Sequence, residues 1–191
     1  MKLRAYFSHK AVVSREITRK ISNREEEKQD FSCEFHTPPP PDSNNKSYYD
    51  DNTSIFGAIL RGENPALVLQ ETESVLALQD KYPNAPLHAL VIPKKCIKTI
   101  RDLKEEDLKL LEEMHDTALE VLRSKSPLAY KEKDYVLCYH LPPFNSVDHL
   151  HLHILAPVSK MNWIYRYGKY FTGTFWCASE YSVLEGLKKK E

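Results

Sequence analysis

Residues 149–155 read His-Leu-His-Leu-His-Ile-Leu. Successive side chains of a β-strand point to opposite faces, so a strand over residues 149–156 places His149, His151 and His153 on one face. The apolar residues between them lie on the other face, which we expect to pack on the core. The histidine face then borders a cleft. Because the chain has only eight histidines, three in strict alternation indicate a functional site.

Three interpretations compete for this histidine face. A plain surface strand would not require histidine, because Thr, Lys or Glu would serve equally well. A zinc site meets a geometric obstacle, because His149 and His153 lie about 13 Å apart along a strand, while each Zn–N bond measures roughly 2.0–2.1 Å. A third ligand would have to come from elsewhere, and neither a cysteine pair nor an adjacent carboxylate offers one. We therefore expect no metal and no cofactor.

The third interpretation is phosphoryl chemistry. A neutral imidazole is a good nucleophile and titrates near physiological pH. His151, in the middle of the three, can attack phosphorus while its neighbours hold phosphate oxygens and transfer protons. The preceding loop supports this interpretation, because Asn145 and Ser146 could donate hydrogen bonds to a phosphate or a leaving group. Ordinary turn chemistry explains these two loop residues equally well.

The rest of the chain predicts an α+β domain with an antiparallel sheet. Apolar residues at three- and four-residue spacings between residues 103 and 122 predict a long helix. A short helix over residues 54–61 and a C-terminal helix over 179–190 complete the helical part. Besides 149–156, strands are expected at residues 66–71, 74–80, 87–93 and 134–140. Strands joined by hairpins, with helices beside them, favour this fold class.

Composition restricts the class of protein. A chain of 191 residues with 41% hydrophobic content suits one domain plus a tail. Zero net charge argues against a nucleic-acid partner. The chain lacks the roughly 18–20 consecutive apolar residues of a membrane span, so no membrane association is expected. Four well-separated cysteines are typical of reduced thiols, so we expect a cytoplasmic protein, with the nucleus as an alternative.

Residues 1–52 are expected to form a disordered, basic N-terminal tail. Residues 1–24 contain seven Lys or Arg and one acidic residue, and Pro38–Pro41 is a proline run. Such a stretch buries too little apolar area to offset the entropy lost on ordering it. Its basic, acid-poor start leaves a mitochondrial transit peptide as an alternative. The folded domain should occupy residues 53–191.

The histidine pattern resembles the motif His-φ-His-φ-His-φ-φ of the histidine triad (HIT) superfamily, in which φ is apolar. The resemblance extends from about Thr53 to Ala156. Within the superfamily, the chain is similar to the phosphoramidase branch of histidine triad nucleotide-binding proteins. The stretches that carry this similarity are Ile-Phe-Gly at residues 55–57, Leu-Val-Ile-Pro-Lys-Lys at 90–95, Pro-Pro-Phe at 142–144 and Ser-Val at 146–147.

The resemblance implies a HIT-like fold over residues 53–191, with a C-terminal extension. This fold is a five-stranded antiparallel sheet with two main helices, and its members are usually homodimers whose sheets join. The implied reaction is hydrolysis of adenosine 5′-monophosphoramidates, with AMP–lysine and acyl-AMP among the candidate conjugates. His151 would attack the α-phosphorus and form a covalent adenylyl-histidine, which water would cleave to AMP. His149 and His153 would contact phosphate and transfer protons, with Ser146 near the leaving group.

The resemblance also assigns positions to the nucleotide. Asp80 matches a carboxylate that binds both ribose hydroxyls, which suits a group able to accept two hydrogen bonds. The other nucleotide-binding candidates lie around the base, the ribose or the phosphate, and they are Phe56, Ile59, Leu78, Gln79, His140 and Asn145. Core packing explains the three apolar members equally well. His88 matches a histidine near the triad.

Several positions depart from the family pattern. Cys96 stands where histidine is usual, Asn145 replaces glutamine, and Lys81 replaces an apolar residue beside the ribose. These departures bear on the leaving group rather than on the chemistry at phosphorus. Ser54 and Gly57 occupy the positions at which some members carry a Cys-x-x-Cys zinc pair, so no zinc is expected there.

The leading interpretation is a nucleoside phosphoramidase. It is favoured over the nucleotidyltransferase branch, because the third triad position holds His153 where that branch has glutamine. The alternatives are an AMP-binding regulatory or scaffold protein with little turnover, and a dinucleoside polyphosphate hydrolase. Removal of AMP from DNA ends would call for a basic cleft or a zinc finger near the triad, and neither follows His153.

Overall fold

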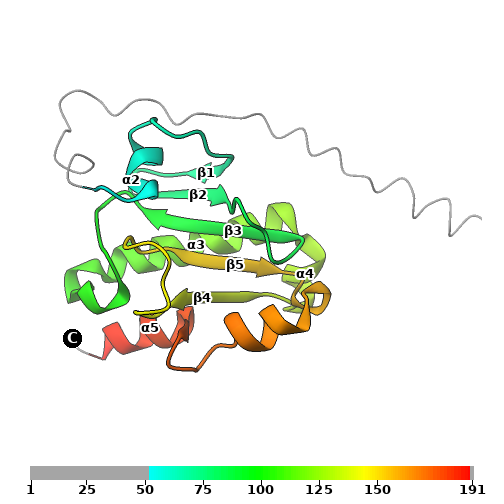
Figure 1. Ribbon diagram of the computed structural model, residues 1–191. Coiled ribbons are helices and arrows are strands. Elements are labelled where there is room, and N and C mark those ends of the chain that lie inside the picture. The colour runs from blue at the N-terminus through cyan, green and yellow to red at the C-terminus, as the bar shows by residue number, and fades with distance from the viewer. Residues whose placement is uncertain (1–51, 190–191) are drawn as a thin grey trace, which may run out of the picture. The chain divides into compact units, whose positions relative to one another are not determined.

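The described residues are built around a six-stranded antiparallel sheet (Figure 1). The computed structural model describes residues 52–189, all of which lie in one compact unit. The order of strands across the sheet is β1-β2-β3-β5-β4-β6. Their bounds are Val68–Glu71 (β1), Val75–Gln79 (β2), Leu87–Pro93 (β3), Val136–His140 (β4), Leu152–Ala156 (β5) and Cys177–Ser179 (β6).

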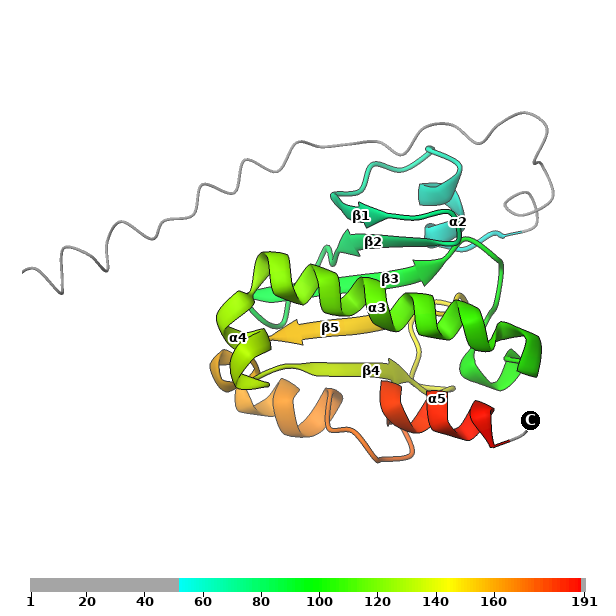
Figure 2. The same ribbon diagram turned by 180° about the vertical axis from the view of Figure 1, so that it is seen from behind.

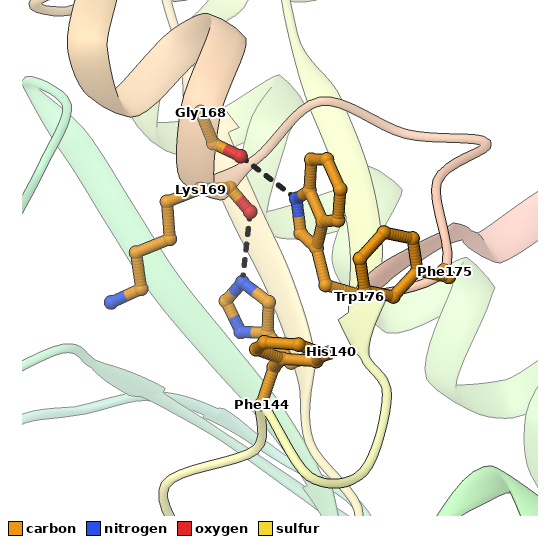
Figure 3. Close-up of a pocket in the computed structure, with 6 residues that line it drawn as sticks. All are labelled: His140, Phe144, Gly168, Lys169, Phe175 and Trp176. Atoms are coloured by element: carbon orange, nitrogen blue, oxygen red, sulfur yellow. Dashed lines mark hydrogen bonds between the residues drawn. The ribbon is translucent and has the colours of Figure 1, made fainter.

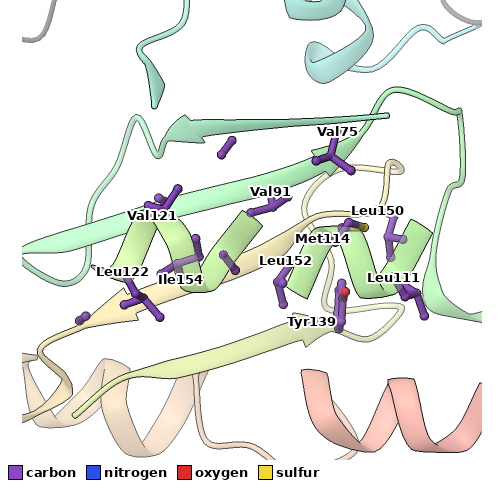
Figure 4. Close-up of a cluster of buried hydrophobic side chains, with 14 of the residues drawn as sticks. Val75, Val91, Leu111, Met114, Val121, Leu122, Tyr139, Leu150, Leu152 and Ile154 are labelled. Atoms are coloured by element: carbon purple, nitrogen blue, oxygen red, sulfur yellow. The ribbon is translucent and has the colours of Figure 1, made fainter. Parts of the chain in front are cut away.

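One face of the sheet is covered by the long helix α3, Leu108–Lys125, which crosses the strands in Figure 2. Its buried side chains include Leu111, Met114, Val121 and Leu122, and they recur at the spacing expected of one helix face. Alternate residues of the strands meet them from the sheet (Figure 4). Helices α4 (Pro127–Glu132) and α5 (Glu180–Lys188) contact α3 beside this core.

Two smaller groups of residues pack on the opposite face of the sheet. Helix α2, Ile55–Leu60, packs its apolar side chains on β2 and β3. Tyr170 and Met161 belong to a cluster that includes residues of β4, β5 and β6. The triad histidines lie on this face, because they alternate with Leu150, Leu152 and Ile154, which point into the α3 core (Figure 4). The candidate site therefore lies on the face opposite α3, between α2 and the cluster that contains Tyr170 and Met161.

The expected α+β fold with an antiparallel sheet is confirmed, and three details differ. A sixth strand, β6, extends the sheet, and its three residues are too short to show an alternating pattern. Helix α4 follows α3 after a single residue, at a point where the sequence predicted only the end of a helix. The expected five-stranded count was therefore wrong by one strand.

The third difference concerns the strand that carries the histidines, which begins at Leu152 and not at His149. The backbone amide of Leu150 donates to the Ile97 carbonyl, at 2.7 Å, in the loop after β3. His149 uses its ring to bind the Pro93 carbonyl. The first half of the motif therefore leaves the strand ladder and turns toward this loop.

The predicted tail, residues 1–52, lies outside the described residues except for its last position. Asn52, that last position, is buried, and its side-chain amide contacts His149. None of the helices between residues 52 and 189 combines the length and the apolar character that crossing a membrane requires.

Candidate active site

The three motif histidines are buried together on the face opposite α3. Their side chains are at most 6% exposed, and the rings of His151 and His153 are 5.0 Å apart. The ring of Phe56, from α2, packs 5.3 Å from His151 and 5.8 Å from His149. The positions of the three side chains therefore agree with the predicted shared histidine face, and His149 is the most deeply buried of them.

His149 has both ring nitrogens bonded to the protein. Nε2 lies 2.9 Å from the Pro93 carbonyl, which can only accept, so Nε2 carries the proton. Nδ1 then accepts from the side-chain amide of Asn52 at 2.8 Å. Burial lowers the pKa of His149 to about 4. His149 is therefore held neutral, in one tautomer, with no nitrogen left for a substrate.

His151 is held in the opposite tautomer. Its Nδ1 donates to the backbone carbonyl of His149 at 2.6 Å, so Nε2 carries the lone pair. Burial, the largest cause, lowers the pKa of His151 below its ordinary value, so the ring stays neutral near pH 7. Among residues 52–189, no side chain or backbone group is hydrogen-bonded to Nε2. A neutral imidazole with such an unprotonated nitrogen is the form that a nucleophile requires.

His153 is the centre of a row of three hydrogen-bonded imidazoles that runs across the sheet from β3 to β4. The backbone amide of Asn84 donates to His88 Nδ1 at 3.3 Å, so His88 Nε2 carries a proton and donates to His153 Nδ1 at 3.0 Å. His153 Nε2 then donates to His140 Nδ1 at 3.1 Å. His140 Nε2 donates to the Lys169 carbonyl at 3.2 Å. Backbone groups at both ends thus set the direction of the whole row.

These rings are also neutral. Burial lowers the pKa of His140 to about 4, and it lowers the pKa of His88 and, more strongly, of His153. Each ring in the row therefore has one N–H and one lone pair, which is the state that a chain of alternating donors and acceptors requires. The partners of His153 are themselves titratable, whereas those of His149 are a carbonyl and an amide.

Lys169 brings positive charge to the site, and the sequence analysis did not single it out. It ends a π-helical turn, Tyr165–Lys169, and its ammonium lies over the Tyr170 ring, 5.2 Å from the centroid. That ring packs within 5.6 Å of His88, His140 and His153, measured between centroids. The Lys169 charge contributes to the lowered pKa of all three and of His151. The only sequence signal was the mixture of aromatic and basic residues in this turn.

The residues assigned to the base and the ribose lie on the β2–β3 side of the triad. Phe56, Ile59 and Leu78 are buried in one apolar cluster, with Phe56 against the histidines. Asp80 follows β2, and its carboxylate accepts from the Tyr82 amide at 2.7 Å and lies 3.4 Å from His88 Nε2. Gln79, the last residue of β2, is partly exposed.

The two loop residues differ in position. Asn145 lines a narrow cleft together with His140, His149 and His151, and its amide donates to the Asp148 carboxylate at 2.9 Å. Ser146 is exposed and does not line that cleft. The positions proposed for a cysteine zinc pair have another use here, because Ser54 caps α2 by accepting from the Gly57 amide at 3.1 Å.

The folded chain also brings together two groups of side chains that could act as metal ligands. The ligand atoms of His140, His151 and His153 lie within 4.8 Å of one another, as do those of Asp80, His88 and His153. The third ligand that the strand alone could not provide therefore comes from β4, or from β3 with the residue after β2. Within these groups, His153 is hydrogen-bonded to His140 and to His88.

Comparison with known proteins identifies a matching family and several similar proteins. The family described as "Scavenger mRNA decapping enzyme C-term binding" matches residues 53–167. The chain is 36% identical over 140 residues to an adenosine 5′-monophosphoramidase, HINT3, of Danio rerio, covering 73% of this chain and 84% of the relative. It is 40% identical over 104 residues to a bifunctional adenosine 5′-phosphosulfate phosphorylase/adenylylsulfatase, HINT4, of Arabidopsis thaliana, covering 53% and 68%. A HIT family hydrolase from Legionella pneumophila is structurally similar, with a TM-score of 0.50 and 36% identity, over 53% of this chain and 90% of the other.

Proposed function

Because the chain belongs to the histidine triad (HIT) superfamily, we propose that it is an adenosine 5′-monophosphoramidase, a hydrolase that cleaves the P–N bond between AMP and an amine. Relatives that carry this name are 30–36% identical over 72–73% of the chain. The observation that carries the proposal is the tautomer of His151, whose Nδ1 is bonded to the His149 carbonyl and whose Nε2 is left as a nucleophile. Binding alone would not require such a group.

The reaction proceeds in two steps. His151 Nε2 attacks the α-phosphorus, a bond forms between nitrogen and phosphorus, and the substrate P–N bond breaks. The amine leaves with that electron pair and takes up one proton, and the water of the second step gives up one proton, so the protonation of the enzyme is restored after each turnover. Water then attacks the same phosphorus, the adenylyl-histidine bond breaks, and AMP is released with net consumption of one water.

Proton transfer is assigned to His153 rather than to His149. Both nitrogens of His149 are bonded to groups that do not titrate, so its role is to position His151. The partners of His153 are imidazoles, which can pass a proton along the row toward His140. The Lys169 ammonium beside Tyr170 supplies positive charge for the phosphate. Asp80 is assigned to the ribose hydroxyls, and no metal or cofactor takes part in a step.

The main alternative is an AMP-binding protein with little turnover. A second alternative is cleavage of a different bond to the adenylyl phosphorus, which the name of the Arabidopsis relative favours. Both are tested with the same assay, in which adenosine 5′-phosphoramidate, adenosine 5′-phosphosulfate and a dinucleoside polyphosphate are compared as substrates. We expect the phosphoramidate to react fastest.

The decisive experiment compares the wild-type protein with His151→Ala on adenosine 5′-phosphoramidate, whose leaving group is ammonia. Loss of the nucleophile should reduce kcat/KM by roughly a thousandfold or more. Acid-quenched wild-type protein should carry one adenylyl group on a peptide containing His151, as seen by mass spectrometry. The variant should still bind AMP.

His115→Gln provides the matched control, because His115 lies on α3, on the other side of the sheet. It should retain wild-type activity and form the adduct. Folded wild-type protein that binds AMP but releases none from any of the substrates would contradict the proposed hydrolysis and support the binding alternative.

A further inference from the structure

Tyr170 lies alongside the whole row of imidazoles. Its ring centroid is 5.6 Å from that of His88, 5.4 Å from that of His153 and 5.2 Å from that of His140. The residue is 2% exposed, and burial raises the pKa of its hydroxyl, which therefore keeps its proton. No step of the proposed reaction involves this hydroxyl.

The hydroxyl of Tyr170 holds the loop at one end of the row. Its oxygen accepts a hydrogen bond from the side-chain amide of Asn84 at 3.0 Å. That side-chain amide also donates to the Tyr82 carbonyl at 3.3 Å, within the loop between β2 and β3. The backbone amide of Asn84 is the group that donates to His88 Nδ1, at 3.3 Å. Asn84 therefore joins Tyr170, through its side chain, to His88, through its backbone.

The backbone next to Tyr170 holds the other end of the row. The carbonyl that accepts from His140 Nε2, at 3.2 Å, belongs to the peptide group that joins Lys169 to Tyr170 (Figure 3). The N–H of the same peptide group donates to the Tyr165 carbonyl at 2.9 Å, which fixes the orientation of the group. Tyr170 thus contributes to the partners of the row at both of its ends.

The direction of the row decides what the triad presents to a phosphate. In the observed direction, His153 Nε2 carries a proton and donates it to His140. The ligand atoms of His151 and His153 lie within 4.8 Å of each other, so a lone pair for the phosphorus and a proton donor for a phosphate oxygen are close together. In the reversed direction both nitrogens would present lone pairs, which an anionic phosphate repels.

We propose that Tyr170 is a positioning residue that fixes the direction of the hydrogen bonds in the row and thereby keeps His153 as a proton donor toward the phosphate. The inference rests on the proposed function, because it explains how the residue assigned to proton transfer is held in one tautomer. Reversal would place a proton on His88 Nδ1, facing the proton of the Asn84 backbone amide. The hydroxyl of Tyr170 opposes reversal, because it holds Asn84 in place through the side chain.

Tyr170→Phe tests this inference, because it removes the hydroxyl and keeps the ring. The first readout is the nitrogen NMR spectrum of protein labelled in its histidine rings, in which protonated and unprotonated nitrogens differ. In the wild type we expect a protonated Nε2 and an unprotonated Nδ1 at His153. In the variant these two signals should move toward each other, because the reversed row becomes populated. Tyr135→Phe, which removes a hydroxyl from a tyrosine packed on the α3 core, is the matched control and should keep the wild-type spectrum.

The second readout is kinetic. Loss of a general acid costs about 10²–10⁴-fold in rate. Because the Lys169 carbonyl still holds one end of the row in Tyr170→Phe, we expect a smaller fall, about tenfold, in kcat for adenosine 5′-phosphoramidate. Asn84→Ala removes the same link from its other side, so it should have the same effect on spectrum and rate. The double variant should be no slower than either single variant, because the two residues act through one hydrogen bond.

The Kd of adenosine, which has no phosphate, should be the same in all these variants. An unchanged His153 tautomer in Tyr170→Phe would overturn the inference, and so would losses of rate that add in the double variant. Wild-type protein that shows the expected tautomers, and their change in Tyr170→Phe, but hydrolyses no AMP conjugate would instead overturn the proposed hydrolysis and leave the role of Tyr170 in place.

Discussion

At the scale of single residues, hydrogen bonds decide which histidine does what. His149, His151 and His153 are equivalent in the sequence pattern, yet backbone carbonyls, Asn52 and two further histidines give each a different set of partners. The pattern could predict that the three share a face, because alternation is a local property. It could not assign their tautomers, because every partner except the His149 carbonyl comes from a distant part of the chain.

Lys169 provides a test at this scale. Burial is the main cause of the lowered pKa of His140, His151 and His153, and the positive charge of Lys169 lowers these pKa values further. Lys169→Gln should raise these pKa values, so that activity, which needs neutral imidazole, is lost at a higher pH on the acidic side. We expect kcat/KM near pH 7 to fall about tenfold, because a charge beside the phosphate is also lost. The measurement is the pH profile of kcat/KM for adenosine 5′-phosphoramidate.

Two variants distinguish charge from packing in this test. Lys169→Arg keeps the positive charge and should restore the acidic side of the profile. Lys131→Gln removes an exposed lysine from α4 and should match the wild type. A Lys169→Gln profile that coincides with the wild-type profile would show that the ammonium does not act on the triad.

At the scale of elements, α2 and Asn52, which lies three residues before the helix begins, support the triad. Gly57 lies against Asn52, and a Cβ at Gly57 would lie 2.1 Å from the Asn52 carbonyl oxygen and 2.6 Å from its Cγ. Asn52 in turn donates to His149. The close approach of α2 to this residue thus requires glycine, and it couples the helix to the histidine that positions the nucleophile.

Gly57→Ala should therefore displace Asn52 and disturb His149. Overpacking of this kind costs about 1–3 kcal/mol, so the free energy of unfolding in urea should fall by that amount, with a loss of kcat/KM larger than the loss of AMP affinity. Gly186→Ala is the control, because Gly186 lies in α5 with open space around it. Alanine there should leave stability unchanged or raise it by up to about 1 kcal/mol. Equal behaviour of the two variants would contradict the proposed contact.

The predictions of single elements succeeded where a local period was long enough. Strands β2 and β3 lie close to their predicted ranges, and α3 covers most of the predicted helix but begins at Leu108 rather than at residue 103. Each of these elements repeats its apolar spacing over several residues. Strand β6 was missed, because three residues do not define a period. The start of β5 was misplaced, because Leu150 bonds to Ile97, which is far away in the sequence.

At the scale of the whole molecule, the sheet constrains the homodimer that the family resemblance implies. The outer edge of β4 is paired with β6 of the same chain, with Cys138 opposite Ser179 and His140 opposite Cys177. The edges of the described sheet are therefore β1 and β6. We predict a dimer in which the two sheets join through one of these edges and not through β4.

Light scattering during gel filtration tests this prediction, and we expect twice the mass of one chain. Hydrogen exchange at two protein concentrations then locates the interface. Amides of β1 or β6 should exchange faster on dilution, whereas those of β4 should not change. A single-chain mass at all concentrations would contradict the dimer, and a change confined to β4 would contradict the proposed edges.

Local pattern was sufficient to predict the α+β class, the helix across the sheet and the shared face of the three histidines, because alternation and helical spacing act between neighbours in the chain. Other features depend on segments that meet only in the folded molecule. The row of imidazoles joins residues 65 and 13 positions apart, and Asn52 reaches His149 across 97 residues. The hollow lined by His140 and Trp176 requires β4 and the C-terminal segment to lie side by side. Residue spacing contains no information about such contacts, which arise because burying apolar surface brings those segments together.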